Sequence, residues 1–349
     1  MFKLKYFELF RTLAVALIAL LLTMLFIALI SDQKIETMRI FLAEPLSSKA
    51  HIGNVIEMAI PLMFTGLAMA LLFRMNMFNL GAEGIFFFSG LVAAAIGIQT
   101  GLGPFIHPVL AIAAGGIVGA LIAFIPGFLK ARWNANELVT SLMFNSILLG
   151  VGLYILNYYM RDASAYTTSS YKIASTAQLV RIIPGTRVHI GLLVVLVFIA
   201  LAYIFVYKTR WGYELRMTGA NREFAEYSGI KTGRAIIYVH LIAGFTAGVG
   251  GSVEVLGMHP RFDWVALPGY GFDGALVAML AKNGPLAVVG SAFFLAYIRM
   301  GAEMMARYSD VPAEMLAVIQ SVILLLVSAD QFLKFLKNRM LLKEAEKNG

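Results

Sequence analysis

The sequence predicts an all-α protein that crosses a membrane about ten times. Ten apolar stretches recur along the chain, 60% of its 349 residues are hydrophobic, and only 14% are charged. The hydrocarbon core of a bilayer is about 30 Å thick, so each crossing helix needs roughly 20 mostly apolar residues. Helices are required because lipid offers no hydrogen-bond partners to the backbone. A soluble fold would leave most of this apolar surface exposed.

The expected crossing helices follow one another along the whole chain. Residues 12–30, 191–207 and 315–329 contain no charged side chain. The first stretch is long for the apolar part of a signal peptide and has no small-residue cleavage site, so we interpret it as a retained helix. The ten expected spans are 11–31, 54–73, 79–99, 105–129, 137–159, 189–207, 236–256, 265–281, 285–304 and 313–333.

One expected span, 265–281, differs from the others in composition. It contains Pro268, Gly269 and Gly271, which are poor residues for a continuous helix. A broken or re-entrant element therefore stays an alternative here. We keep a full crossing because its removal would place the lysine-rich C-terminus on the other side of the membrane.

The distribution of basic residues predicts the orientation. An even number of spans puts both termini on one side, and the loops on that side carry twice as many Lys and Arg residues as the opposite loops. Basic loops are typical of the cytoplasmic side, so both termini are expected there. The same bias explains the net charge of +8 through contact with anionic lipid, without any nucleic acid.

The chain is expected to form one transmembrane domain, residues 1–349, without a soluble domain. Three connections are long: the outer loops 31–53 and 160–188, and the cytoplasmic segment 208–235. Within the cytoplasmic segment, Gly219 is expected to end one short helix. Asn221 is expected to cap the next, because an Asn side chain accepts a free N–H bond there.

This second short helix is predicted over residues 222–228, with Gly229 closing it. It would carry Phe224, Ala225 and Tyr227 on one side and polar residues on the other. A capped helix of this size suits docking into a groove of another protein. An interfacial helix lying on the lipid headgroups is the alternative, and the residues alone favour neither.

Two pairs of glycines lie four residues apart within expected spans. Gly115 with Gly119, and Gly244 with Gly248, let helix backbones approach closely. We interpret them as packing sites within the bundle, with a subunit interface as the alternative.

Several kinds of chemistry have no residues to support them. The chain has no cysteine, which excludes thiol catalysis and Cys-based metal sites. It has no Gly-Lys dipeptide and hence no Walker A loop, no HExxH or GxSxG motif, and its five histidines are scattered. The protein is therefore expected to be no enzyme and to hold no metal or cofactor.

Neutral polar side chains dominate the polar positions of the expected spans. Such residues bond neighbouring helices or line a path for an uncharged polar solute. The one ionisable side chain expected mid-span is Asp273, which is thin support for ion coupling. The candidate pathway residues are Asn54, Thr65, Ser89, Asn145, Asp273 and Gln320.

Four motifs together resemble one family. They are NLGAEG from Asn79, NANELVTSLMFN from Asn134, GANREFAEYSGI from Gly219, and GYGFDGALVAMLAKNGPLAVV from Gly269. The chain resembles the inner-membrane permease subunits of ABC importers for simple sugars and nucleosides, closest to the nucleoside branch. The family usually has Leu-Gly where this chain has Ala281-Lys282.

The resemblance implies a type II importer fold of ten helices, like that of the vitamin B12 importer. It also implies a second, homologous permease subunit, an ATPase that uses ATP and Mg²⁺, and an extracellular substrate-binding lipoprotein, all at a bacterial inner membrane. The segment 208–235 would carry the coupling helix that contacts the ATPase. Its residues would be Gly219, Ala220, Asn221, Phe224, Ala225, Glu226, Tyr227, Ser228, Gly229 and Ile230.

Basic residues of the outer loops are candidates for docking the binding protein, because opposite charges steer association. Ordinary solvated loop charges are the alternative. The candidates are Arg161, Lys172, Arg181, Arg187, Arg261 and Arg307.

The sequence thus predicts a permease subunit for a neutral polar solute, with nucleosides first. Riboflavin or a simple sugar is the nearest alternative, because the polar residues do not identify a ligand. An ion-coupled carrier and a lipid-side scaffold or flippase are alternatives of other classes.

Overall fold

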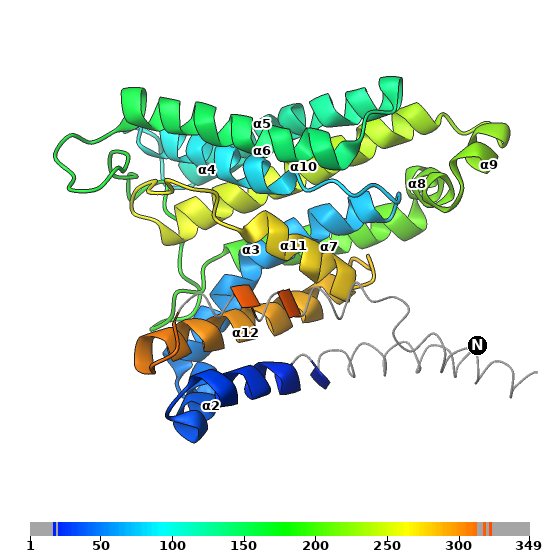
Figure 1. Ribbon diagram of the computed structural model, residues 1–349. Helices are drawn as coiled ribbons and strands as arrows, with labels where there is room; N and C mark the ends of the chain where they lie inside the picture. Colours follow the sequence, from blue (N-terminus) through cyan, green and yellow to red (C-terminus); the bar gives the residue numbers. More distant parts are fainter. Residues whose placement is uncertain (1–16, 19, 313–316, 319–320, 323–349) are drawn as a thin grey trace, which may run out of the picture. The chain divides into compact units, whose positions relative to one another are not determined.

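The computed structural model describes residues 17–18, 20–312, 317–318 and 321–322 (Figure 1). These residues form two units, one built from the described residues before Ser48 and after Tyr297, the other from Ser48–Tyr297. In the described residues all regular structure is helical apart from two isolated β-bridges. This agrees with the predicted all-α class.

The described residues contain six helices that are long and apolar enough to cross a membrane. Three shorter apolar helices, Leu20–Ile30, Ala82–Gly97 and Tyr270–Leu280, lie at further expected spans. Most of the expected span 313–333, like the beginning of 11–31, lies outside the described residues. The long helices are α3 (Lys49–Phe73), α5 (Ile106–Trp133), α6 (Glu137–Ile155) continued by η2 (Leu156–Met160), α7 (Gly191–Lys208), α10 (Thr232–Met258) and α12 (Ala287–Tyr308).

The unit that contains the N-terminal part of the chain has a helix where the sequence led us to expect a loop. Residues 31–53 include α2 (Lys34–Ala43), the short η1 (Glu44–Leu46) and the first turn of α3. Ser31 and the backbone N–H of Asp32 both donate hydrogen bonds to Asp310, at 2.7 and 2.8 Å. The mixed charges of α2 concealed its helical character from a hydropathy-based prediction.

In the larger unit, α3 is buried over almost its whole length and packs against α10 and α11 (Tyr270–Leu280), while α10 also packs against α4 (Ala82–Gly97) and α5. The two glycine pairs meet each other at the crossing of α5 and α10. A Cβ atom at Gly119 would lie 2.4 Å from the carbonyl oxygen of Gly244, and one at Gly248 would lie 2.5 Å from that of Gly115. Packing within the bundle is therefore confirmed.

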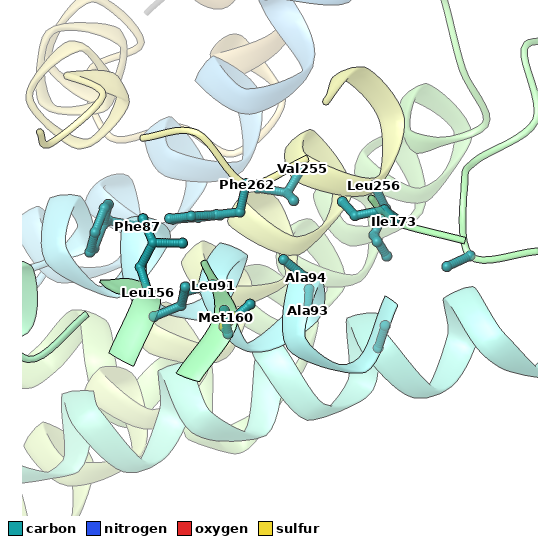
Figure 2. Close-up of a cluster of buried hydrophobic side chains, with 12 residues drawn as sticks. Phe87, Leu91, Ala93, Ala94, Leu156, Met160, Ile173, Val255, Leu256 and Phe262 are labelled. Atoms are coloured by element: carbon teal, nitrogen blue, oxygen red, sulfur yellow. The ribbon is translucent and has the colours of Figure 1, made fainter. Parts of the chain in front are cut away.

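A cluster of twelve buried apolar side chains joins the loops 160–188 and 259–269 to α4 and α10 (Figure 2). Phe87 and Leu91 of α4 pack there with Leu256 of α10, and with Ile173 and Phe262 from the two connecting loops. The loop 160–188 is therefore a packed cap rather than a loose connection.

The expected full crossing at 265–281 is a half-length helix instead. α11 has 11 residues, which corresponds to about 16 Å against a bilayer core of about 30 Å. Pro268 cannot donate a backbone hydrogen bond, and Gly269 has φ +85°, so the helix begins only after them. Gly274 of α11 fits against Thr65 and Asn283 lies at Arg74, so α11 runs parallel to the second half of α3.

Candidate functional site: the pair of short helices and the junction behind them

The predicted pair of short helices is present between α7 and α10 (Figure 1). They are α8 (Arg210–Ala220) and α9 (Arg222–Tyr227). Asn221 lies between them and accepts a hydrogen bond from the N–H of Phe224 at 2.9 Å, as an N-cap should. Gly229 closes the turn with φ +82°. The sequence predicted both of these boundary residues.

Hydrogen bonds fasten α9 to the beginning of α10. The side chain of Thr232 donates to Glu226 at 2.5 Å, and Arg222 pairs with Glu226 at 3.2 Å. These two partners, the Thr232 hydroxyl first, hold the pKa of the Glu226 carboxyl below its ordinary value. Glu226 is therefore ionised near neutral pH, and the contacts persist until the pH falls through that lowered pKa.

The exposed apolar face of α9 contains fewer residues than the sequence suggested. Tyr227 is 93% exposed and Phe224 is 55% exposed, whereas Ala225 is fully buried. Successive helical residues differ by about 100°, so Phe224 and Tyr227 lie about 60° apart, while Ala225 points elsewhere. The expectation that all three share one face is thus wrong. The exposed apolar surface of α9 consists of the two aromatic side chains.

The turn after α3 contacts the C-terminal end of α8. Asn76 donates a side-chain hydrogen bond to the carbonyl oxygen of Gly219 at 2.8 Å. A Cβ atom at Gly219 would lie 2.1 Å from the carbonyl oxygen of Arg74, so only glycine permits this approach. Gly219 therefore serves a close backbone contact as well as a helix end.

Glu83 caps the half-length helix α11 from a different helix. Its carboxyl oxygens accept backbone N–H bonds from Gly269 at 2.6 Å, from Gly271 at 2.5 Å and from Phe272 at 3.2 Å. Glu83 is fully buried and also lies in the first turn of α4, so two helix N-termini meet at one carboxyl group. Gly271 makes room for this, since a Cβ atom there would lie 2.4 Å from the backbone of Glu83.

The second motif holds the first in place. Asn145 accepts a hydrogen bond from the N–H of Gly84 at 2.9 Å and donates one to the carbonyl oxygen of Leu80 at 3.0 Å. Ser141 accepts from the N–H of Leu80 at 3.1 Å. Three of the four motifs therefore meet at one buried junction, whereas the fourth contacts the turn after α3 through Gly219. The roles of Glu83, Ser141 and Arg74 were missed by sequence reasoning, although Glu83 lies in a motif.

The candidate pathway residues do not converge on one cavity. Thr65 bonds the carbonyl oxygen of Pro61 in its own helix at 3.0 Å and packs against α11. Asn145 holds the junction, and Asp273 is buried in the first turn of α11. Ser89 is fully buried, and its hydroxyl has no hydrogen-bond partner among the described residues. Gln320 lies outside the described residues.

The sixth pathway candidate, Asn54, lines a pocket beside the beginning of α3. Arg181 and Arg187 line the same pocket, together with His51 and the 183–186 turn. Its volume is about 490 Å³. The structure thus brings one pathway candidate together with two docking candidates around a basic cavity.

The other docking candidates differ in how accessible their side chains are to a partner protein. Arg261 donates hydrogen bonds to Asp162 at 2.6 Å and to the carbonyl oxygen of Ser170 at 2.8 Å, which ties the loops 160–188 and 259–269 together. Hydrogen bonds from Ser164 and Arg261 lower the pKa of Asp162 to about 2, so this pairing is ionic across the physiological range. Arg161 and Lys172 are exposed.

The fold and the junction define a multi-pass helical membrane protein that presents a pair of short helices beside its spans. The family model described as branched-chain amino acid transport system / permease component matches residues 51–328. The chain belongs to this family of ABC transporter permeases. Permeases of this kind are not catalytic, and ATP is hydrolysed by partner subunits.

Three curated relatives are similar over most of their length. The guanosine ABC transporter permease protein NupP of Bacillus subtilis is 32% identical over 301 residues, 84% of this chain and 86% of that protein. The glucose ABC transporter permease protein TsgB13 of Haloferax volcanii is 29% identical over 310 residues, 86% and 82% of the two chains. The nucleoside ABC transporter permease protein NupB of Lactococcus lactis is 26% identical over 293 residues, 81% and 80%.

Proposed function

We propose that this chain is the translocating subunit of an ABC importer for nucleosides. Two of the three relatives described above are named for guanosine or nucleosides. The absence of Walker A and metal-binding motifs fits a subunit that binds no cofactor and leaves ATP and Mg²⁺ to its ATPase. A simple sugar is the second candidate, because the glucose permease is nearly as similar.

The observation that carries the proposal is the exposed aromatic pair on α9. Phe224 and Tyr227 project from a helix that is capped by Asn221 and fastened to α10 through Glu226. Exposed aromatic side chains on a held helix are typical of binding hot spots. In our proposal this helix is the coupling helix, and a groove of the ATPase receives the two rings.

The proposed importer also has a defined membrane topology and orientation, and a second permease subunit. The proposal has ten crossings of the membrane in a type II importer fold, one of them made by a coiled segment followed by the half-length α11, with both termini in the cytoplasm of a bacterium and the chain in its inner membrane. The excess of basic residues on one side supports the orientation. Much of α5, α6 and α7 is exposed although apolar, so these helices need lipid or a second, homologous permease as cover.

At the outer face, we assign the basic pocket to the binding protein. Arg181 and Arg187 lie at its rim and are exposed. Acidic side chains on the lobes of the binding lipoprotein would find complementary charge there. Arg261 is excluded from this role, because Asp162 and Ser170 already occupy its guanidinium group.

The test is solute uptake by the complete transporter in proteoliposomes, with radiolabelled guanosine, uridine, glucose and riboflavin as separate cargoes. The proposal predicts ATP-dependent accumulation of the nucleosides and at most slight accumulation of the others. Accumulation of glucose or riboflavin without nucleosides would overturn the solute assignment and leave the permease role intact.

A further inference from the structure

The turn that ends α3 is shaped to touch two other helices. The N–H of Met77 bonds the carbonyl oxygen of Leu72, and the N–H of Asn76 bonds that of Phe73. This is a Schellman motif, in which the residue at the position of Asn76 is left-handed, here with φ 54°. Glycine is the usual residue there. The Asn side chain is therefore not needed to end the helix.

What the Asn76 side chain does is bind α8. Its amide donates to the carbonyl oxygen of Gly219, in the last turn of α8, where carbonyl groups lack partners within their own helix. Gly219 lies so close to the backbone of Arg74 and Met75 that no side chain fits between them. A displacement of α8 is therefore transmitted directly to the turn.

The same turn holds the other end of the half-length helix. The Arg74 guanidinium donates to the carbonyl oxygen of Asn283 at 2.8 Å, just after α11 ends. It also lies 4.8 Å from the ring centroid of Tyr207, at the end of α7. Glu83 holds the N-terminus of α11, so side chains from the α3–α4 region fix both ends of α11.

We propose that Arg74 and Asn76 are positioning residues that link the short-helix pair α8–α9 to α11. Asn76 binds α8 and Arg74 binds α11, within three residues of one tight turn. When the ATPase displaces α9, the turn carries α11 along, and α11 shifts beside α3. This inference rests on the proposed contact between α9 and the ATPase.

The test uses the substitution Asn76→Gly in the complete transporter. Glycine keeps the left-handed conformation and removes only the hydrogen bond to Gly219. The matched control is Asn134→Gly, because Asn134 ends α5 with φ 49° in the same way, and its side chain accepts a hydrogen bond from Arg222 of α9, at 3.4 Å, rather than one from the turn after α3. The chain has no native cysteine, so introduced cysteines can carry spin labels directly.

Two label pairs report on the two helices separately. Cysteines at Glu223 and Val109 follow α9 against α5, and cysteines at Phe272 and Val109 follow α11 against α5. All three positions are exposed. Distances are measured by pulsed electron paramagnetic resonance, with and without trapped nucleotide.

In the unsubstituted protein both distances are expected to change when nucleotide is trapped. With Asn76→Gly, the α9 distance still changes, the change in the α11 distance becomes smaller, and solute moved per ATP hydrolysed falls by about fivefold, which corresponds to the loss of one hydrogen bond. Asn134→Gly is expected to behave as the unsubstituted protein. Arg74→Lys should retain more coupling than Arg74→Met, because it keeps a donor and a charge.

Two negative outcomes can be told apart. If the α9 distance is unchanged by nucleotide in the unsubstituted protein, the proposed ATPase contact is wrong. If α9 responds and α11 follows it as far in Asn76→Gly as in the unsubstituted protein, the contact with the ATPase stands and the linkage through Asn76 is overturned.

Discussion

At the scale of single residues, the close contacts of glycine α-carbons with neighbouring backbone shape the candidate site more than the polarity of its side chains does. Gly219 was expected to end a helix; α8 ends one residue later, at Ala220, and the α-carbon of Gly219 lies against the backbone of Arg74 and Met75. Gly271 similarly makes room for Glu83. These contacts explain why glycines belong to the motifs that identify the family.

Gly219→Ala is predicted to separate α8 from the turn after α3. The added Cβ would meet the carbonyl oxygen of Arg74, which is backbone and cannot rotate away, so we expect a loss of about 1–3 kcal/mol in unfolding free energy. Thermal unfolding in detergent measures this loss. Gly233→Ala is the control, since its nearest neighbour would be 3.9 Å away and Ala favours a helix. Equal stability of the two variants would contradict the close contact.

Glu83→Gln is predicted to weaken the N-terminus of α11. Glutamine keeps one acceptor oxygen but loses the charge and turns an NH₂ group toward three N–H donors, so about 1–3 kcal/mol should be lost. Hydrogen exchange of the Gly271 and Phe272 amides should quicken. Glu214→Gln removes only a surface pair with Arg210 and should change stability by less than about 1 kcal/mol. Unchanged exchange at Gly271 would refute the cap.

Sequence reasoning found the chemical types of these residues but not their partners. Asn221 and Gly229 were predicted because caps are local, set by the neighbours along the chain. The partners of Glu83 and Asn145 lie 186 and 61 residues away, which no local pattern reveals. Lys282, where the family usually has Gly, adopts φ 48°, a conformation glycine reaches without strain.

At the scale of elements, helix length separates two kinds of apolar helix. Hydropathy located α3, α5, α6, α7, α10 and α12 because each is long and apolar. It also marked 265–281, although α11 has only 11 residues, because hydropathy cannot tell a half-length helix with a coiled approach from a full one. The buried carboxyl group of Glu83 supplies what such a helix lacks, a partner for its free N–H groups.

The double substitution Phe224→Ala, Tyr227→Ala is predicted to release the ATPase. Both side chains are exposed, so the fold should survive, while losing two aromatic hot spots should lower co-purified ATPase by about tenfold or more. Tyr166→Ala, on an equally exposed outer tyrosine, is the matched control. A substitution such as Ala225→Arg would not test the contact with the ATPase, because Ala225 is buried. Undiminished co-purification would mean that the ATPase binds elsewhere.

At the scale of the whole molecule, the chain is an ABC transporter permease that provides a route but not the energy. A family model over residues 51–328 and a relative 32% identical over 84% of the chain support that class. The solute, the second permease and the orientation belong to our proposal. Composition was sufficient to predict a multi-pass membrane protein because lipid constrains a sequence strongly. The permease class came from the resemblance of four motifs to a known family. Solute choice depends on few polar contacts, which neither observation identifies.

The most direct measurement compares solute uptake by this chain alone with uptake by the complete transporter, both in proteoliposomes supplied with ATP. The chain alone is expected to accumulate nothing under an ion gradient or with ATP, and uptake is expected to appear only with the ATPase, the second permease and the binding protein. Concentrative uptake by the purified chain on its own would contradict this expectation.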